Sequence, residues 1–243
     1  MSSSAQTTVD PRIGLGDPDC PVCGGMGYVR YEVPITDPGF GKMHHCPVCG
    51  QRIIEAVRAK VFESQRERIA RFSVARPEQT FETFDASGVR PMIYQAYCAA
   101  LQYAAEPRGW LVLHGSYGTG KSHLASAIAN KLSAGQVMSL VVPDLLELLR
   151  SGFDTGDYQE LLDLTRQVRL LILDDMGTES STPWACEKLF QIVNHRYNSV
   201  MPTVFVFNGV VEDMAPRIAS RLKDTAVSKL LPMWGDDYRE RKR

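Results

Sequence analysis

Short apolar runs alternate with longer amphipathic stretches over the last two thirds of the chain. The runs predict strands, and the stretches have the periodicity of helices. Strands are expected at residues 110–114, 137–142, 170–173 and 203–207, and helices at 92–105, 122–132, 144–150, 157–167 and 183–198. Apolar strands that alternate with helices indicate a parallel sheet covered by helices on both faces, so the fold class is α/β.

The first 76 residues follow other patterns. Residues 1–19 are rich in Ser, Thr, Pro and Gly, which predicts disorder. Residues 20–50 hold many Gly and Pro and have too few apolar side chains for a core of their own. Residues 51–76 predict a linker helix, in which apolar side chains repeat at helical spacing. The α/β domain is then expected to comprise residues 77–243.

Basic side chains occupy the other side of the predicted linker helix: Arg52, Arg58, Lys60, Arg66, Arg68 and Arg71. A solvated helix face is the favoured interpretation of such a run. The alternative is a helix that faces a partner protein or DNA.

The amino-acid composition limits which classes of protein the chain can belong to. The 243 residues are 44% hydrophobic, which suits one medium domain with a small appendage. The net charge is −1, so nucleic-acid binding would need a local patch or several subunits side by side. Residues 1–8 lack the apolar core of a signal peptide, and no apolar run approaches the roughly 20 residues of a membrane helix. We therefore expect a cytoplasmic protein without a membrane partner.

Residues 115–122 match the phosphate-binding loop Gly-x-x-x-x-Gly-Lys-Ser, with a predicted strand before it and a helix after it. The glycines let backbone N–H groups point at phosphate oxygens, and the helix dipole adds to their effect. Lys121 is expected to contact the β- and γ-phosphates, and Ser122 to bind magnesium. The sequence thus predicts ATP and Mg²⁺ bound by Gly115, Ser116, Tyr117, Gly118, Thr119, Gly120, Lys121, Ser122 and His123.

Polar side chains follow two other predicted strands. Asp174 and Asp175 come after the strand 170–173. We assign the magnesium shell to Asp174 and the orientation or deprotonation of the attacking water to Asp175. Asn208 follows the strand 203–207 and is a second candidate for positioning that water, although a turn before Gly209 explains it equally well in isolation.

Arg217 and Arg221 are four residues apart and share one helix face. A guanidinium is suited to stabilise charge on a transferring phosphoryl group, from the same subunit or from a neighbour. Taken alone, the pair is better explained as a solvated helix with local salt bridges.

Together these residues resemble the AAA+ ATPases of the DnaC/IstB group, which contains helicase loaders and transposition ATPases. The resemblance covers roughly residues 77–243 and rests on segments 80–85, 115–123, 171–177, 190–197, 217–222 and 234–239, with Asn208. It implies that Asn208 is the sensor 1 residue, Arg221 an arginine finger acting on a neighbour's nucleotide, and Arg239 the sensor 2 arginine. It also implies that there is no full lid domain, that the chain self-associates into a ring or spiral, and that turnover is slow without DNA or a partner.

Two Cys-x-x-Cys-Gly segments indicate a metal site formed by Cys20, Cys23, Cys46 and Cys49. Four thiolates close the coordination shell of a structural zinc, which would supply folding energy to this core-poor segment. His44 or His45 is an alternative ligand, and an iron–sulfur centre or redox dithiol a weaker possibility. Loaders of the resembling DnaI type carry an N-terminal zinc module that contacts the helicase, so partner binding is preferred over a nucleic-acid-binding ribbon.

The first functional hypothesis is an ATP-dependent loader of a replicative DNA helicase. Its ATPase domain would assemble on single-stranded DNA, and residues 1–72 would grip the helicase hexamer. The alternative is an IstB-type ATPase that assists a transposase on duplex DNA; the zinc module favours the loader, because the IstB type usually begins with a helical segment. Asp174, Asp175 and Arg221 argue against an adaptor without hydrolysis, and the lack of an acceptor-binding motif argues against a small-molecule kinase.

Overall fold

The computed structural model describes residues 16–74, 76–132, 135–177 and 182–238. Contacts divide the chain into two units, Met1–Gln65 and Arg66–Arg243, so the division falls inside helix α1 (Gly50–Phe72). Most of the predicted disorder at residues 1–19 lies outside the described residues. None of the helices in the described ranges combines the length and the apolar character that crossing a bilayer requires.

The first unit has little regular structure. Strands β1 (Tyr28–Arg30) and β2 (Met43–His45) form an antiparallel pair in which Tyr28 lies opposite His45. Among its described residues, the buried apolar side chains are the cysteines 20, 23, 46 and 49 and Ile53, from the first turn of α1. This hairpin was not predicted, because its three-residue strands are too short to leave a periodic pattern.

Helix α1 covers most of the predicted linker helix at residues 51–76, but it ends at Phe72. Its apolar stripe is interrupted, because Ile53 and Ile69 are buried whereas Val61 is 61% exposed. Near its end, Arg68 and Arg71 form ion pairs of 2.7 and 2.9 Å with Glu160 and Asp157 of helix α5 (Tyr158–Gln167). These two basic residues therefore help to hold the end of the helix on the second unit.

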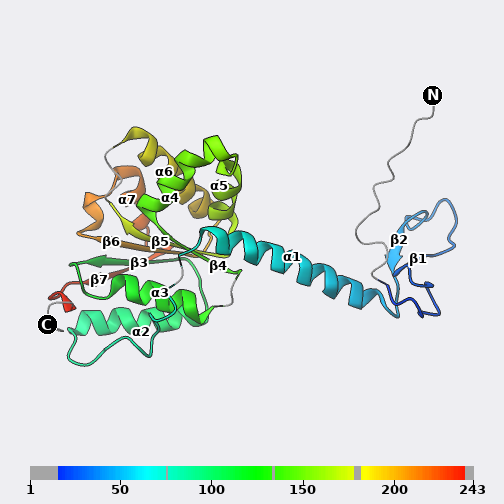
Figure 1. Cartoon of the computed structure of the whole chain (residues 1–243), viewed down its shortest axis with the longest axis horizontal. Helices are drawn as coiled ribbons and strands as arrows, with labels where there is room; N and C mark the ends of the chain where they lie inside the picture. The colour runs from blue at the N-terminus through cyan, green and yellow to red at the C-terminus, as the bar shows by residue number, and fades with distance from the viewer. Residues whose placement is uncertain (1–15, 75, 133–134, 178–181, 239–243) are drawn as a thin grey trace. The chain divides into compact units, whose positions relative to one another are not determined.

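The second unit is built on a five-stranded parallel sheet (Figure 1). Its strands are β3 (Trp110–Gly115), β4 (Val137–Val141), β5 (Leu170–Met176), β6 (Thr203–Asn208) and β7 (Ser228–Met233), in the order β4-β5-β6-β3-β7. The four predicted strands are confirmed. The fifth, β7, was missed because it contains Lys229 and Pro232; an edge position tolerates the proline, which cannot donate a ladder hydrogen bond.

Helices cover both faces of this sheet, as predicted. Alternate strand residues such as Leu111 and Leu113 pack with α2 (Pro91–Ala105) and α3 (Lys121–Lys131). The residues between them, such as Trp110 and Val112, face the other side. That side is covered by α4 (Val142–Thr155), α5, α6 (Pro183–Asn198) and α7 (Pro216–Leu222), and a short 3₁₀ turn, η1 (Val211–Asp213), precedes α7.

A buried arginine ties three of these elements together. Arg196 of α6 is fully buried and donates to Thr203 Oγ1 at 2.9 Å and to the carbonyls of Thr165 and Val168 at 3.1 and 2.9 Å. Burial lowers the pKa of this guanidinium to about 10. Arg196 thus connects the end of α5 to the start of β6 through hydrogen bonds.

Candidate functional site

The predicted phosphate loop joins β3 to the first turn of α3. Gly118 and Gly120 have φ angles of +67° and +89°, which favour glycine. A Cβ at Gly120 would lie 2.6 Å from the ring of Phe84, so the packing excludes a side chain there as well. Lys121 is buried, and its Nζ donates to the carbonyl of Ser116 and, at 3.5 Å, to that of Gly115. The lysine thus lies inside the loop that the sequence assigns to phosphate.

The two consecutive aspartates owe their arrangement to a β-bulge. The pairing of β5 with β6 shifts between Leu173 and Met176, and Asp175 has a φ of +57°. In a regular strand neighbouring side chains point to opposite faces. The bulge removes that alternation, and both Asp174 and Asp175 line one cavity.

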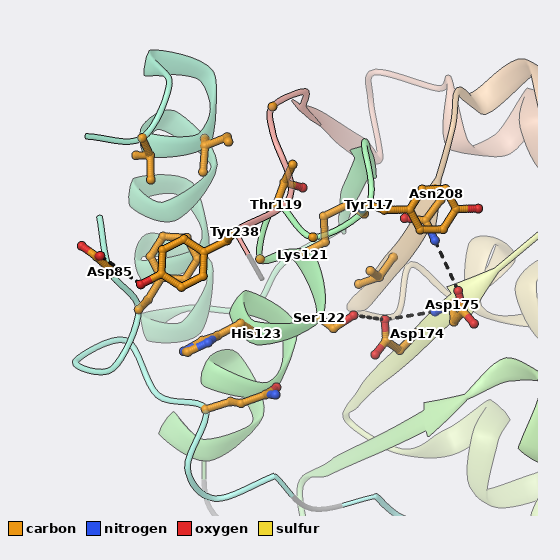
Figure 2. A pocket seen from close by; sticks show the side chains of 18 of the residues that line it. Asp85, Tyr117, Thr119, Lys121, Ser122, His123, Asp174, Asp175, Asn208 and Tyr238 are labelled. Carbon is orange, nitrogen blue, oxygen red and sulfur yellow. Dashed lines mark hydrogen bonds between the residues drawn. The ribbon is translucent and has the colours of Figure 1, made fainter. Parts of the chain in front are cut away.

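Side chains from three elements meet around these carboxylates (Figure 2). The Ser122 hydroxyl donates to Asp174 Oδ1 at 2.8 Å. The Asn208 amide at the end of β6 donates to Asp175 Oδ1 at 3.4 Å. A hydroxyl beside a carboxylate is an all-oxygen pair of the kind that Mg²⁺ prefers, so Ser122 and Asp174 fit a magnesium site.

A cavity of about 600 Å³ contains this arrangement. That volume is in the usual range for a small-molecule or cofactor site. The residues assigned from the sequence that line it are Tyr117, Gly118, Thr119, Gly120, Lys121, Ser122, His123, Asp174, Asp175 and Asn208. Gly115 and Ser116 belong to the same loop and are not among its described lining residues.

Residues of two further segments line the cavity, and these residues were given no individual role from the sequence. One is the segment that enters the domain, with Phe84 and Asp85, and the other is the tail, with Tyr238. The Tyr238 N–H donates to the Gly118 carbonyl at 3.0 Å, and its hydroxyl donates to Asp85 Oδ2 at 3.0 Å. The hydrogen bond to Asp85 raises the pKa of Tyr238. Both segments are among those that carry the family resemblance, but the sequence assigned these residues no place in the site, because their positions depend on segments about 150 residues apart.

His123 contributes mainly by holding the entering segment. Its Nε2 lies 2.8 Å from the Thr80 carbonyl and 3.3 Å from Thr83 Oγ1. Its ring also packs edge-on against Phe84, with centroids 5.4 Å apart. His123, which follows the phosphate loop, therefore joins α3 to the entering segment that contains Phe84.

Arg221 lies away from this cavity, against α6. Its guanidinium lies 4.8 Å from the ring centroid of Phe190 and donates to Asn194 Oδ1 at 2.6 Å and to the Arg217 carbonyl at 2.7 Å. It does not belong to the described lining of the chain's own cavity. Arg239, the predicted sensor 2 residue, lies outside the described residues.

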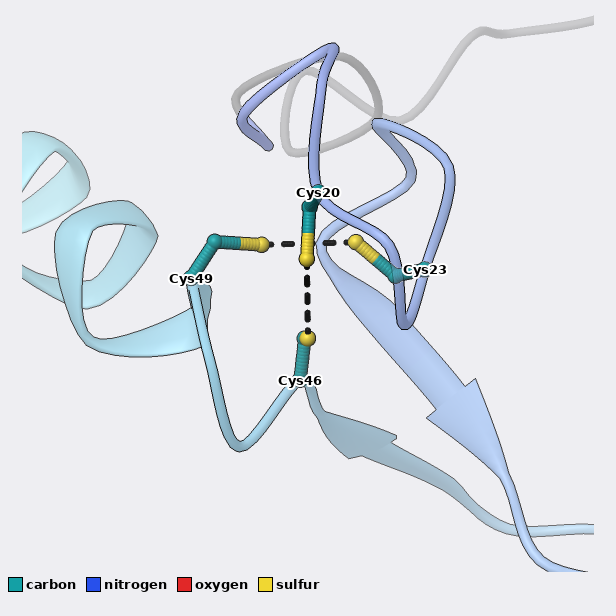
Figure 3. A group of neighbouring side chains, drawn as sticks. All are labelled: Cys20, Cys23, Cys46 and Cys49. Carbon is teal, nitrogen blue, oxygen red and sulfur yellow. Dashed lines mark hydrogen bonds between the residues drawn. The ribbon is translucent and has the colours of Figure 1, made fainter.

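The four predicted zinc ligands converge in the first unit (Figure 3). All four cysteines are buried, and their sulfurs lie within 4.8 Å of one another. The Sγ atoms of Cys20 and Cys46 are 3.7 Å apart, and those of Cys23 and Cys49 are 3.3 Å apart. Four sulfurs at about 2.3 Å from a tetrahedral zinc would be separated by about 3.8 Å, so the cluster fits zinc.

Backbone N–H groups support this cluster. The Gly27 N–H donates to Cys23 Sγ at 3.1 Å. Burial raises the pKa of the Cys46 thiol. The N–H groups of Cys49 and Val48, together with the side chains of Cys20 and Cys49, outweigh burial and lower that pKa to about 7. Such donors favour the thiolate form that binds metal. Neither His44 nor His45 belongs to the convergent group found among the described residues.

Comparison with known proteins relates most of the chain to a family of nucleotide-binding proteins. Residues 52–242 match the family described as IstB-like ATP binding protein. The replicative helicase loader DnaC of Escherichia coli (strain K12) is 31% identical over 165 residues, which cover 58% of this chain and 67% of that protein. The replicative helicase loader DnaI of Bacillus subtilis (strain 168) is 32% identical over 101 residues, which cover 40% of this chain and 32% of DnaI.

Solved structures agree with this relation at the level of the fold. The crystal structure of the DnaC helicase loader superposes with a TM-score of 0.56 and 22% identity, over 64% of this chain and 97% of that chain. At such identity the likeness concerns the fold alone. It supports the helix-covered parallel sheet of the second unit.

Proposed function

The chain belongs to the family of IstB-like ATP-binding proteins, and from that premise we propose that it is an ATP-dependent loader of a replicative DNA helicase onto single-stranded DNA. The observation that carries the proposal is the similarity to DnaC, a replicative helicase loader, over two thirds of that protein's length. The convergence of Ser122, Asp174 and Asp175 in one cavity supports nucleotide chemistry as the driving reaction.

Five residues of the cavity have a proposed part in ATP binding and hydrolysis. Lys121 holds the β- and γ-phosphates, and Ser122 and Asp174 hold Mg²⁺. Bound Mg²⁺ would neutralise charge on the phosphate oxygens. Asp175, held by Asn208, orients the water that attacks the γ-phosphate. We infer hydrolysis that is slow in the isolated chain and stimulated by DNA or a partner.

Self-association into a ring or spiral is part of the proposal. Arg221 lies against Phe190 and Asn194 and is separate from the described lining of its own cavity. An arginine finger on this residue would therefore act on the nucleotide of a neighbouring subunit. In this arrangement ATP would be bound at the interface between two subunits.

The first unit is the proposed contact with the helicase hexamer. Its surface carries several large apolar side chains that are at least 44% exposed: Val22, Met26, Tyr31, Ile35, Phe40, Met43 and Val48. Exposed apolar groups in such number favour a protein partner over nucleic acid. Zinc held by the four cysteines would fix the loops that carry them.

The test is association with the replicative helicase of the same organism, measured by size-exclusion chromatography. Val48→Glu introduces a charge at an exposed position of the zinc unit and should abolish co-elution while ATP binding is retained. Lys42→Glu, at a charged exposed position, is the matched control and should still co-elute. Deletion of residues 1–65 should also abolish co-elution, and it leaves Ile69 of the second unit in place. Co-elution of the deleted form would contradict the proposed contact.

The family description supports a second candidate, an ATPase that assists a transposase on duplex DNA. The two candidates differ in their protein partner. Co-elution with a transposase encoded nearby, together with failure to bind the helicase, would select the second.

A further inference from the structure

The magnesium carboxylate has a basic partner that no sequence motif marks. Arg76 Nη1 lies 3.3 Å from Asp174 Oδ2, while Asp174 Oδ1 accepts from Ser122 at 2.8 Å. The Asp174 side chain is only 9% exposed. Its carboxylate is therefore held at both oxygens, by a hydroxyl on one side and a guanidinium on the other.

The backbone on both sides of Arg76 is anchored to the second unit. Asn130 of α3 donates through Nδ2 to the Arg76 carbonyl at 2.9 Å. Just before it, the Val74 N–H donates to the Ser139 carbonyl of β4 at 2.8 Å, and the Ser139 N–H donates to Ser73 Oγ at 3.0 Å. These bonds limit how far the Arg76 side chain can move from Asp174.

The same short segment begins at the end of α1. Ile69 is buried in the core of the second unit, and Arg71 pairs with Asp157 of α5. Arg76 follows Arg71 by five residues and lines both the nucleotide cavity and a second cavity of about 380 Å³ beside Ile69 and Ser139. A change in the position of Arg76 would thus alter the lining of both cavities.

A cation beside a metal-binding carboxylate can act in two ways. It can contact the phosphates, or it can fix which oxygen of the carboxylate faces the metal. The short contact to Asp174 Oδ2, opposite the oxygen that faces Ser122, favours the second role. The orientation of a ligating carboxylate depends on such hydrogen bonds.

We propose that Arg76 is a positioning residue for the magnesium ligand Asp174, and that it couples Mg²⁺-dependent nucleotide binding to the docking of the end of α1. The proposal rests on the proposed function of the cavity as an Mg²⁺–ATP site. Arg76 holds Asp174 Oδ2, so that Oδ1 stays beside the Ser122 hydroxyl, the other proposed magnesium ligand. The hydrogen bonds of Ser73 and Val74 to β4, and of the Arg76 carbonyl to α3, link the position of Arg76 to the end of α1.

The first test measures binding of a fluorescent ATP analogue to the full chain, in Mg²⁺ and in EDTA. Arg76→Gln should raise the Mg²⁺ concentration needed for half-maximal binding about tenfold, as other partners of metal ligands do, and leave the affinity in EDTA unchanged. Arg76→Lys should recover part of the loss. Arg108→Gln, at an exposed arginine that pairs locally with Glu106, is the control and should match the wild type.

Equal loss of affinity in Mg²⁺ and EDTA would overturn the positioning role, because it would indicate a direct phosphate contact. An unchanged Mg²⁺ requirement would overturn it as well. Failure of the proposed function gives a different result, since the wild type itself would then show no Mg²⁺-dependent binding.

The coupling is tested by hydrogen exchange of residues 68–74. Mg²⁺ and the ATP analogue should slow exchange of the Val74 amide, which donates to Ser139, in the wild type and not in Arg76→Gln. The same protection in both proteins would overturn the coupling.

Discussion

The Ser122 hydroxyl donates a 2.8 Å hydrogen bond to Asp174 Oδ1, across 52 positions of the sequence. This contact joins the phosphate loop at the start of α3 to the acidic end of β5. Strand β3, which leads into the phosphate loop, and strand β5 end at the same edge of the parallel sheet. This is the edge at which α/β proteins bind their ligands. The contact therefore defines the centre of the proposed Mg²⁺–ATP site.

Lys121→Ala should weaken ATP binding by roughly ten- to hundredfold. The substitution removes a charge-assisted contact worth roughly 1.5–3 kcal/mol. Isothermal titration with ATP and Mg²⁺ measures the change. Lys131→Ala, at the exposed end of the same helix, is the control and should bind ATP normally. Unchanged affinity in Lys121→Ala would refute the phosphate assignment.

Asp175→Asn should bind ATP normally and hydrolyse it at least about 100-fold more slowly, because the water loses its carboxylate partner. Asn is the appropriate replacement, since it tolerates the φ of +57° at this position better than Ala does. Single-turnover hydrolysis measures the chemical step directly. Asp154→Asn, on an exposed turn of α4, should retain full activity. Normal turnover in Asp175→Asn would assign the water to another residue.

The purified full chain should contain about one zinc ion per molecule, measured by mass spectrometry of the metal. Cys46→Ser should lose the ion and expose the first unit to proteolysis, because that unit has few other buried apolar side chains. Cys98→Ser, outside the cluster, should keep the ion. A folded and zinc-free wild type would rule out the structural metal.

Arg221→Ala should hydrolyse ATP poorly alone and regain activity when mixed with Lys121→Ala. The Lys121→Ala subunit is expected to offer an intact arginine to the functional cavity of its neighbour. The mixture should therefore exceed the sum of the two separate rates in a steady-state assay. Rates that merely add would show that Arg221 does not act between subunits.

Arg196→Met should lower the free energy of unfolding by about 2–4 kcal/mol. The carbonyls of Thr165 and Val168 would lose their donor and remain buried. Urea denaturation measures the change. Arg169→Met is the control, because that side chain is exposed and donates only a surface hydrogen bond to Gln136. A loss equal to that of the control would contradict the connecting role of Arg196.

Much of the fold was predictable because its strands are continuous apolar runs. Trp110 to Leu113 and Leu170 to Leu173 are buried on both faces and leave an unambiguous pattern. Strand β7 left none, since an edge strand can contain Lys229 and Pro232. The extension of β5 through Asp174 and Asp175 also depends on a bulge, which the sequence pattern does not show.

The candidate site likewise contains residues that the sequence could predict and residues that it could not. The phosphate loop and the aspartate pair form local motifs, so they could be identified from adjacent residues. Arg76, Asp85 and Tyr238 reach the cavity only because distant segments pack together. The position of Arg221 beside Phe190 likewise depends on the packing of α7 against α6.

The central claim is tested most directly by loading the cognate hexameric helicase onto closed circular single-stranded DNA coated with its binding protein. Loaded helicase is counted by its unwinding of an annealed oligonucleotide after excess helicase is removed. The wild-type chain with ATP should give strong unwinding, and Lys121→Ala should give none. Equal unwinding without the protein, or with Lys121→Ala, would contradict an ATP-dependent helicase loader.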